Sequence, residues 1–201
     1  MAGAVPGRGP ATGAVVLHDY WRSSASYRVR IALALKGIGY DRVAVDLVAG
    51  AQRGPAHLSL NPQGLVPALE IDGRVLTQSL AIIEYLDETH PSPPLLPAEP
   101  LARAQVRALA QMVACEMHPP NNLRVLNYLG QTLKVDEAGK NAWYSHWARS
   151  GLEAFERQLA LLDAERKADG LPASTFCWVA SLIEVVLVTL RPKNTSPSFS
   201  A

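Results

Sequence analysis

The sequence predicts a small α/β domain with a mixed sheet, followed by an all-helical domain. Three observations support this fold class. Apolar patterns over residues 15–88 give the order β-α-β and then β-β-α. Residues 91–100 (PSPPLLPAEP) are typical of a linker, and helical periodicity dominates from Leu101 onward. We therefore expect a disordered extension over 1–13, an α/β domain over 14–92, a linker over 93–100 and a helical domain over 101–201.

The opening β-α-β unit follows from residue spacing. Val15–His18 is a short apolar run with β-branched residues, which is typical of a buried strand. Ser23–Lys36 keeps one apolar stripe at helical spacing, and Gly37 follows where a helix-ending glycine belongs. Tyr40–Val48 alternates apolar and polar residues, which predicts a second strand.

A β-hairpin and another helix complete the first domain. Val66–Ile71 and Val75–Thr77 flank the dipeptide Asp72-Gly73, a combination typical of a tight hairpin. Ser79–Glu88 has helical character, and we expect Ser79 to be its N-cap residue.

Three helices are predicted in the second domain. Leu101–His118 is long and is closed by Pro119-Pro120, after which Asn122–Leu133 resumes the helical pattern. Ala142–Lys167 is a long amphipathic segment.

Bulk composition narrows the function classes. The 201 residues are 48% hydrophobic and carry a formal net charge of +1, so nothing electrostatic predicts a nucleic acid or an anionic membrane as partner. The two cysteines form no metal-type spacing, and we expect no metal site and a reducing, cytoplasmic location. Residues 1–13 lack the apolar core of a signal peptide, and the apolar run Trp178–Leu190 is too short to span a bilayer.

Three short segments are candidate sites for a small anionic peptide. Ser23-Ser24 opens the first predicted helix, where free N–H groups stabilise an anion and a hydroxyl can donate to a thiolate. Gln78-Ser79 opens the second helix in the same way, and plain helix capping is the alternative for both pairs. Val66-Pro67 fits either a cis bond that exposes backbone to an extended peptide or an edge-strand proline. Together they point to a peptide with a thiol and carboxylates.

Longer motifs resemble one known family. Residues 20–33 (YWRSSASYRVRIAL) are similar to the signature of the zeta-class glutathione transferases, the maleylacetoacetate isomerases. Further similar segments are 60–69 (LNPQGLVPAL), 78–86 (QSLAIIEYL) and 118–126 (HPPNNLRVL). The resemblance runs in order through residues 15–163, which makes it far more specific than one short motif.

The resemblance implies a thioredoxin-like domain, then a helical glutathione transferase domain, with glutathione as cofactor. Ser23 matches the serine beside the glutathione thiol, and Ser24 is a second candidate catalytic residue. The other matched positions are contacts for glutathione or its substrate: Ser26 and Arg28 around the thiol, the Val66 backbone before cis Pro67 for the cysteinyl unit, Gln78 and Ser79 for the γ-glutamyl end, Gln52 near the glycine end, His118 and Asn122 from the helical domain, and Arg22 and Arg124 for the substrate carboxylates.

The activity implied is the cis–trans isomerisation of maleylacetoacetate to fumarylacetoacetate, in tyrosine and phenylalanine catabolism, by a homodimer. Thiolate addition makes the double bond single, rotation follows, and elimination restores the trans alkene. A maleylpyruvate isomerase or general glutathione transferase would use the same residues. A non-catalytic glutathione transferase-like protein is a third alternative.

Two features depart from the family pattern. Ala25 stands where the signature usually has cysteine, and because the reacting sulfur belongs to glutathione this change leaves the activity possible. After Cys177 the sequence no longer aligns with the family, so we expect an atypical or truncated end to the helical domain.

Other chemically capable side chains have structural interpretations. Cys115 lies among apolar neighbours on a helix, and we expect it in the core. The aromatic stripe Trp143, Trp147 and Phe155 is expected in the core as well, and His146 in solvent. Besides their match to the signature, Arg28 and Arg30 on the first helix are expected on structural or solvated faces.

Overall fold

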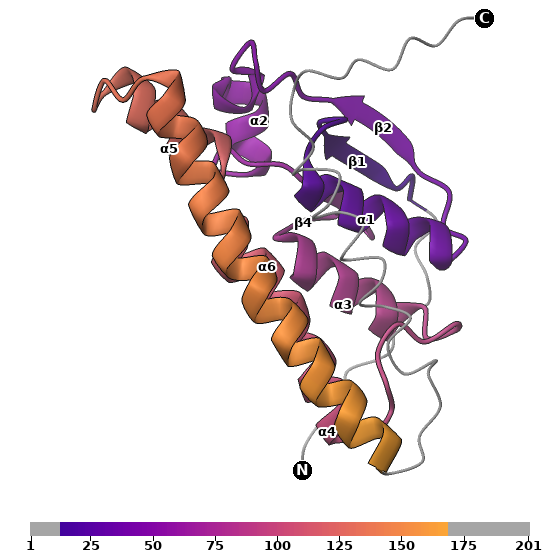
Figure 1. Cartoon of the computed structure of the whole chain (residues 1–201). Helices are drawn as coiled ribbons and strands as arrows, with labels where there is room; N and C mark the ends of the chain where they lie inside the picture. The colour runs from indigo at the N-terminus through magenta and orange to yellow at the C-terminus, as the bar shows by residue number, and fades with distance from the viewer. Residues whose placement is uncertain (1–12, 169–201) are drawn as a thin grey trace, which may run out of the picture. The chain divides into compact units, whose positions relative to one another are not determined.

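The computed structural model describes residues 13–168. The chain divides into two compact units, one ending at Pro94 and the other beginning at Leu95 (Figure 1). The first unit is α/β with a mixed sheet and the second is helical, which confirms the predicted fold class. Residues 1–12 and 169–201, and with them the expectations for the N-terminal extension and the segment after Cys177, lie outside the described residues.

The first unit contains a four-stranded sheet in the order β2-β1-β3-β4. Strand β1 (Val16–Asp19) pairs in parallel with β2 (Asp41–Ala44) and antiparallel with β3 (Ala68–Ile71). Strand β4 (Arg74–Thr77) closes the hairpin with β3. Strand β1 alternates partly buried and buried residues, as a strand with one packed face does, whereas in β3 every residue except Glu70 is buried.

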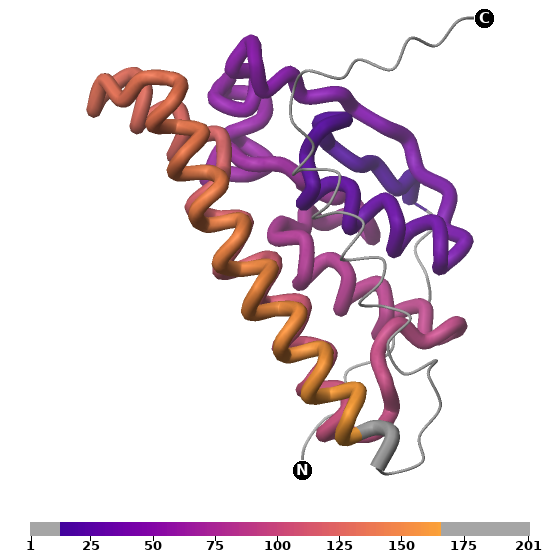
Figure 2. Tube along the Cα trace, in the orientation of Figure 1, coloured from indigo at the N-terminus to yellow at the C-terminus, as the bar shows by residue number. Residues whose placement is uncertain are grey.

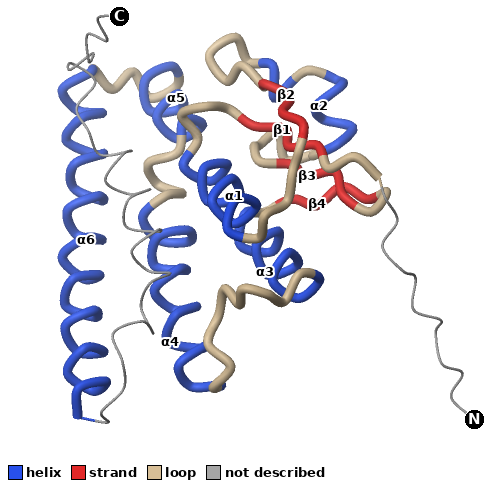
Figure 3. The backbone as a smooth tube through the Cα atoms, turned by 90° about the vertical axis from the view of Figure 1, so that its right-hand side faces the viewer, coloured by secondary structure: helices blue, strands red, loops and turns tan. Residues whose placement is uncertain are grey.

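Helices cover both faces of this sheet. Helix α1 (Ser24–Leu35) and helix α3 (Ser79–Thr89) pack together on one face, and α2 (Pro55–Leu60) lies on the other (Figure 3). The core between the sheet and the two long helices consists of fully buried aliphatic side chains: Leu17, Val29, Leu33, Leu69, Ile82 and Leu86. Each such side chain contributes about 1.5–3 kcal/mol through its removal from water.

Strand β2 is shorter and more exposed than the alternating pattern predicted. It ends at Ala44 rather than Val48, and all four of its residues are exposed because it is the edge of the sheet. The chain turns where the Asp46 carboxylate accepts hydrogen bonds from the Val48 and Ala49 amides. The short helices η1 (Ala51–Arg53) and α2 follow, in a segment where periodicity predicted no element.

The hairpin turn has the expected chemistry. Asp72 (φ 53°) and Gly73 (φ 69°) both adopt the left-handed conformation that a two-residue type I′ turn requires. The Tyr85 hydroxyl of α3 donates a hydrogen bond to the Asp72 carboxylate, with an O–O distance of 2.5 Å. This hydrogen bond is the main cause of a raised pKa of Tyr85. The turn is thereby tied to the helix that packs against the hairpin.

The second unit is built around two long helical segments. Helix α4 (Pro100–Gln111) continues without a break into a π-helical turn, η2 (Met112–Met117), where the sequence predicted one regular helix. Helix α5 (Leu123–Gln131) follows, and α6 (Glu137–Ala168) runs as one uninterrupted helix (Figure 2). The core of this unit is formed by Leu109, Val113, Met117, Phe155 and Leu162.

Several expectations for this unit need correction. Helix α6 begins at Glu137 rather than Ala142, because the Asp136 carboxylate caps it by accepting from the Gly139 amide. Phe155 is in the core, but Cys115 and Trp147 are exposed, since both point away from the buried face of their helices. Trp143 is partly buried and donates to the Pro120 carbonyl. No helix within residues 13–168 has the length and apolarity to cross a membrane.

Candidate active site

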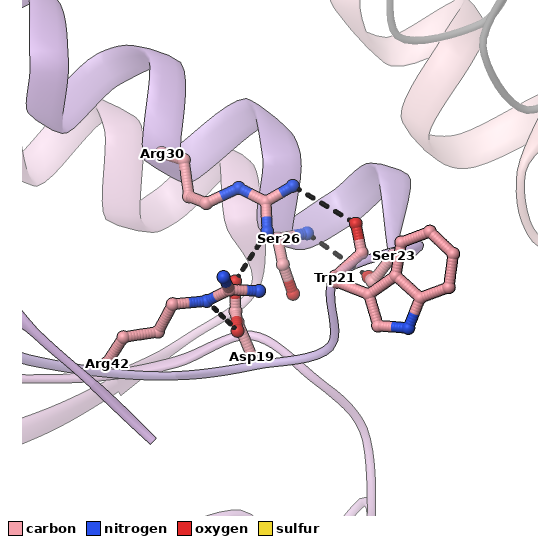
Figure 4. Close-up of polar contacts among 6 residues, drawn as sticks. All are labelled: Asp19, Trp21, Ser23, Ser26, Arg30 and Arg42. Atoms are coloured by element: carbon pink, nitrogen blue, oxygen red, sulfur yellow. Dashed lines mark hydrogen bonds and ion pairs between the residues drawn. The ribbon is translucent and has the colours of Figure 1, made fainter. Parts of the chain in front are cut away.

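Ser23 is the N-cap residue of α1. Its backbone is extended, and its Oγ accepts a hydrogen bond from the Ser26 amide at an N–O distance of 3.2 Å (Figure 4). This capping uses a lone pair of the hydroxyl and leaves the hydroxyl proton available to a further acceptor. The first amides of the helix and its positive dipole end lie at the same place. The local geometry therefore combines the capping role with a potential donor to a thiolate.

The Val66-Pro67 bond is cis, one of the two alternatives that the sequence left open. The sheet ladder begins at Ala68, so the Val66 backbone lies outside it. The preceding Leu65 carbonyl accepts two hydrogen bonds from buried side chains, at 2.9 Å from His57 Nε2 and 2.8 Å from Asn61 Nδ2. Because a carbonyl can only accept, Nε2 of His57 carries the proton. These two donors fix the peptide that leads into Val66.

The start of α3 differs from the predicted cap. Gln78, not Ser79, is the N-cap residue, and it adopts φ 68° and ψ 111°, a conformation that non-glycine residues rarely adopt. Ser79 is the first residue of the helix. The Gln78 side chain donates to Gln63 Oε1 at 2.7 Å, so both glutamine side chains are held beside the helix N-terminus.

Arg28 is buried, at 5% exposure, so of the structural and solvated alternatives the structure supports the structural one. Its NH1 donates to Ser79 Oγ at 2.9 Å and joins α1 to α3. Ser26 is also buried, and its Oγ has no hydrogen-bond partner among the described residues. Arg28 therefore links α1 to the first residue of α3 from within the fold.

Two further predicted residues lie at the surface of the first unit or just beneath it. Arg22 is exposed, with its guanidinium 5.4 Å from the centre of the Trp21 ring. Gln52 lies in η1, and its Oε1 is buried without a hydrogen-bond partner in the described chain. An unpartnered buried amide oxygen favours a ligand N–H at this position.

The second unit brings its own three predicted residues together. Asn122 is the N-cap of α5, and its Oδ1 accepts from the Arg124 amide at 3.1 Å. Its Nδ2 lies 3.3 Å from His118 Nε2, across the turn made by Pro119-Pro120. The Arg124 side chain is exposed.

The hydrogen bonds that support the site could not be predicted from the sequence. Asn61 lies inside the motif LNPQGLVPAL, but only the fold shows that it holds the Leu65 carbonyl together with His57. Spacing also could not reveal the Arg28–Ser79 bond, since its partners are 51 residues apart.

Comparisons with known proteins agree with this architecture. Residues 22–89 match the family model "Glutathione S-transferase, N-terminal domain". The maleylacetoacetate isomerase of Rhizobium meliloti (strain 1021) is 56% identical over 144 residues, which covers 72% of this chain and 68% of that protein. The maleylpyruvate isomerase of a Ralstonia species is 50% identical over 145 residues, with coverage of 72% and 68%.

Solved structures give the same result. A holo maleylpyruvate isomerase, described as a bacterial zeta-class glutathione transferase, matches with a TM-score of 0.71 and 38% identity over 83% of this chain and 89% of that chain. A maleylacetoacetate isomerase from Methylobacterium extorquens AM1, solved with malonate and glutathione, matches with a TM-score of 0.69 and 38% identity over 86% and 91%.

Fold and site thus define a glutathione transferase. Within that class, the chain belongs to the zeta-class family of maleylacetoacetate and maleylpyruvate isomerases.

Proposed function

We propose that this protein is a glutathione-dependent isomerase that converts maleylacetoacetate to fumarylacetoacetate. The observation that carries the proposal is the α1 N-terminus, where Ser23 caps the helix through a lone pair and keeps its hydroxyl proton free to donate. Relatives that are 56% and 46% identical, from Rhizobium meliloti and Rattus norvegicus, are maleylacetoacetate isomerases. The Ser23 geometry and the relatives point to the same reaction, because this isomerisation depends on a stabilised thiolate.

The residues of the first unit fit glutathione as a ligand. The buried Gln52 Oε1 has no partner among the described residues and would accept an N–H near the glycine end. The Val66 backbone lies outside the sheet ladder and is available to the cysteinyl unit. The N-terminus of α3, at Gln78 and Ser79, would hold the γ-glutamyl carboxylate.

Bound glutathione would supply a thiolate that adds reversibly to the substrate double bond. The contribution of the protein is to keep that sulfur deprotonated and to orient the substrate. The Ser23 hydroxyl would donate a hydrogen bond to the sulfur, and the amides and dipole of α1 would favour its negative charge. Ser24 lies at the first position of the helix, where its amide adds to this field.

Two arginines are proposed as ligands for the substrate carboxylates. The planar guanidinium of Arg22 is exposed beside Trp21, and Arg124 is exposed near the start of α5. Planar guanidinium groups suit carboxylates because they donate two parallel hydrogen bonds. The family resemblance also leads us to propose His118 and Asn122, which lie 3.3 Å apart through Nε2 and Nδ2, as ligand contacts.

Maleylpyruvate is the second candidate substrate, because the Ralstonia relative that acts on it is 50% identical. The test is an isomerase assay on both maleyl compounds with glutathione, with no thiol, and with S-methylglutathione. We expect turnover only with glutathione, since S-methylation removes the attacking sulfur without removing the binding groups. If folded, glutathione-bound protein turns over neither of the two substrates, the proposal is contradicted and a non-catalytic relative is favoured.

We further propose a cytoplasmic homodimer. The family resemblance supports the dimer, and the absence of a predicted disulfide framework supports a reducing compartment. Sedimentation velocity across micromolar concentrations is expected to show a dimer. A monomer with intact helical circular dichroism at all of these concentrations would refute that part of the proposal.

A further inference from the structure

Asp19, the last residue of β1, is fully buried and holds two arginines. Its Oδ2 accepts from Arg30 NH1 at 2.7 Å, and its Oδ1 accepts from Arg42 Nε at 2.7 Å (Figure 4). Arg30 comes from α1 and Arg42 from the edge strand β2. A buried carboxylate with two guanidinium partners has a strongly defined position, because either oxygen would lose a charged donor if it moved.

Arg30 also reaches the turn that leads to Ser23. Its NH2 donates to the Trp21 carbonyl at 3.2 Å, and its guanidinium lies 5.2 Å from the centre of the Tyr27 ring. The turn is closed by a hydrogen bond from the Ser23 amide to the Tyr20 carbonyl at 2.8 Å. Arg30 therefore connects the buried end of β1 to the segment that carries Ser23.

Arg42 offers a natural comparison within the same cluster. It binds the other oxygen of the same carboxylate at the same 2.7 Å distance. Unlike Arg30, it makes no hydrogen bond to the turn over residues 20–23 among the described residues. Its side chain is also more exposed, at 44% against 18% for Arg30. Both arginines therefore pair with the charge of Asp19, but only Arg30 also holds the turn, so variants of the two residues distinguish these roles.

We propose that Asp19 and Arg30 are positioning residues that fix the turn over residues 20–23 and so aim the Ser23 hydroxyl at the glutathione sulfur. Asp19 orients the guanidinium, and the second nitrogen of that guanidinium holds the Trp21 carbonyl. The planar fork is essential, since it presents two donors in fixed directions, whereas a lysine ammonium is a point charge on a flexible stem. The inference rests on the proposed function, because its effect is exerted on bound glutathione.

The test compares Arg30→Lys with the matched variant Arg42→Lys. Both keep a positive charge near Asp19, but only the first removes the fork that holds the turn. We expect Arg30→Lys to lower kcat about tenfold or more, since small misplacements of catalytic groups have effects of that size. The KM for glutathione should change little, and the pKa of the bound thiol should rise. Arg42→Lys should match wild type in all three quantities.

Three outcomes would overturn the inference. The first is wild-type kcat and wild-type thiol titration in Arg30→Lys, which would leave Arg30 only a charge role. The second is an equal loss of kcat in Arg30→Lys and Arg42→Lys. The third is wild-type protein without calorimetric binding of glutathione, which would remove the proposed function itself and is recognised before any variant is made. If Arg30→Lys does not fold, Asp19→Asn keeps the side-chain shape and should show the same loss of kcat with little change in KM.

Discussion

Arg28 and Ser79 are hydrogen-bonded inside the first unit, with 2.9 Å between NH1 and Oγ. The bond joins α1 to α3 and places a buried guanidinium behind the N-terminus of α3. Ser79 therefore has a structural role in addition to the glutathione contact that we propose for it.

Ser79→Ala should lower both stability and glutathione affinity. The variant leaves a buried, charged donor without one acceptor, which costs about 1.5–3 kcal/mol of unfolding free energy. Urea unfolding and calorimetric titration with glutathione measure the two effects. Thr89→Ala, at the exposed opposite end of α3, is the control and should change neither. A stability loss with unchanged affinity would restrict Ser79 to its structural role.

Asn61→Ala should weaken glutathione binding although the side chain bonds only to backbone. It removes the donor to the Leu65 carbonyl and the acceptor of the Gln63 amide, so the peptide before Val66 is held by His57 alone. We expect a stability loss of about 1–3 kcal/mol, together with a higher dissociation constant for glutathione. The exposed Ser59→Ala is the control. A folded Asn61→Ala variant with wild-type affinity would show that this peptide does not set the site.

Gly151→Ala should destabilise the helical unit although alanine is the better helix former. An added Cβ would overlap Cγ and Sδ of Met117, which is buried in the core of that unit. Such overpacking costs about 1–3 kcal/mol. Combining it with Met117→Ala should cost less than the sum of the two single changes, which thermal unfolding can measure. Ser150→Ala, exposed on the same helix, is the control, and strict additivity would contradict the predicted overlap.

The cap of α4 should make stability depend on pH. Hydrogen bonds from the Ala102 and Leu101 amides lower the pKa of the Glu99 carboxyl. A lowered folded-state pKa means that the stabilisation is present at neutral pH and is lost as the pH falls through that value. Glu99→Gln should therefore be less stable than wild type at neutral pH, with a difference that shrinks in acid. Glu153→Gln, exposed in the middle of α6, should show no such trend.

The element order of the first unit was predictable because each boundary has a local signal. Ser23 caps α1 and Gly37 follows it with φ 65°, so the sequence placed both ends of this helix within one residue. The cap of α3 was misplaced by one residue. Gln78 adopts a positive φ that its residue type disfavours, so the local sequence gives no signal for a cap at that position.

Buried polar residues were the least predictable part of the candidate site. Arg28 is normally a surface residue type, and its burial depends on a partner in another helix. Cys115 and Trp147 failed in the opposite direction, because the apolar stripe of a helix does not reveal which of its edges is covered. The burial or exposure of these side chains depends on residues far away in the sequence, which local spacing cannot predict.

The central claim is that the Ser23 hydroxyl stabilises the glutathione thiolate. Ser23→Ala also removes the helix cap, at a cost of about 1 kcal/mol, whereas Ser23→Gly removes the hydroxyl at a cost of only a few tenths. Comparing the two variants therefore separates the thiolate effect from the capping effect. Ser24→Ala is the neighbouring control.

The most direct measurement is the pH dependence of thiolate absorbance in the enzyme–glutathione complex. The account predicts that Ser23→Gly and Ser23→Ala raise the pKa of the bound thiol alike and lower kcat near neutral pH about ten- to a hundred-fold, the value of one hydrogen bond to a charged group. Ser24→Ala should leave the titration close to that of wild type. A thiol titration unmoved in both Ser23 variants, or moved only by Ser24→Ala, would contradict the claim.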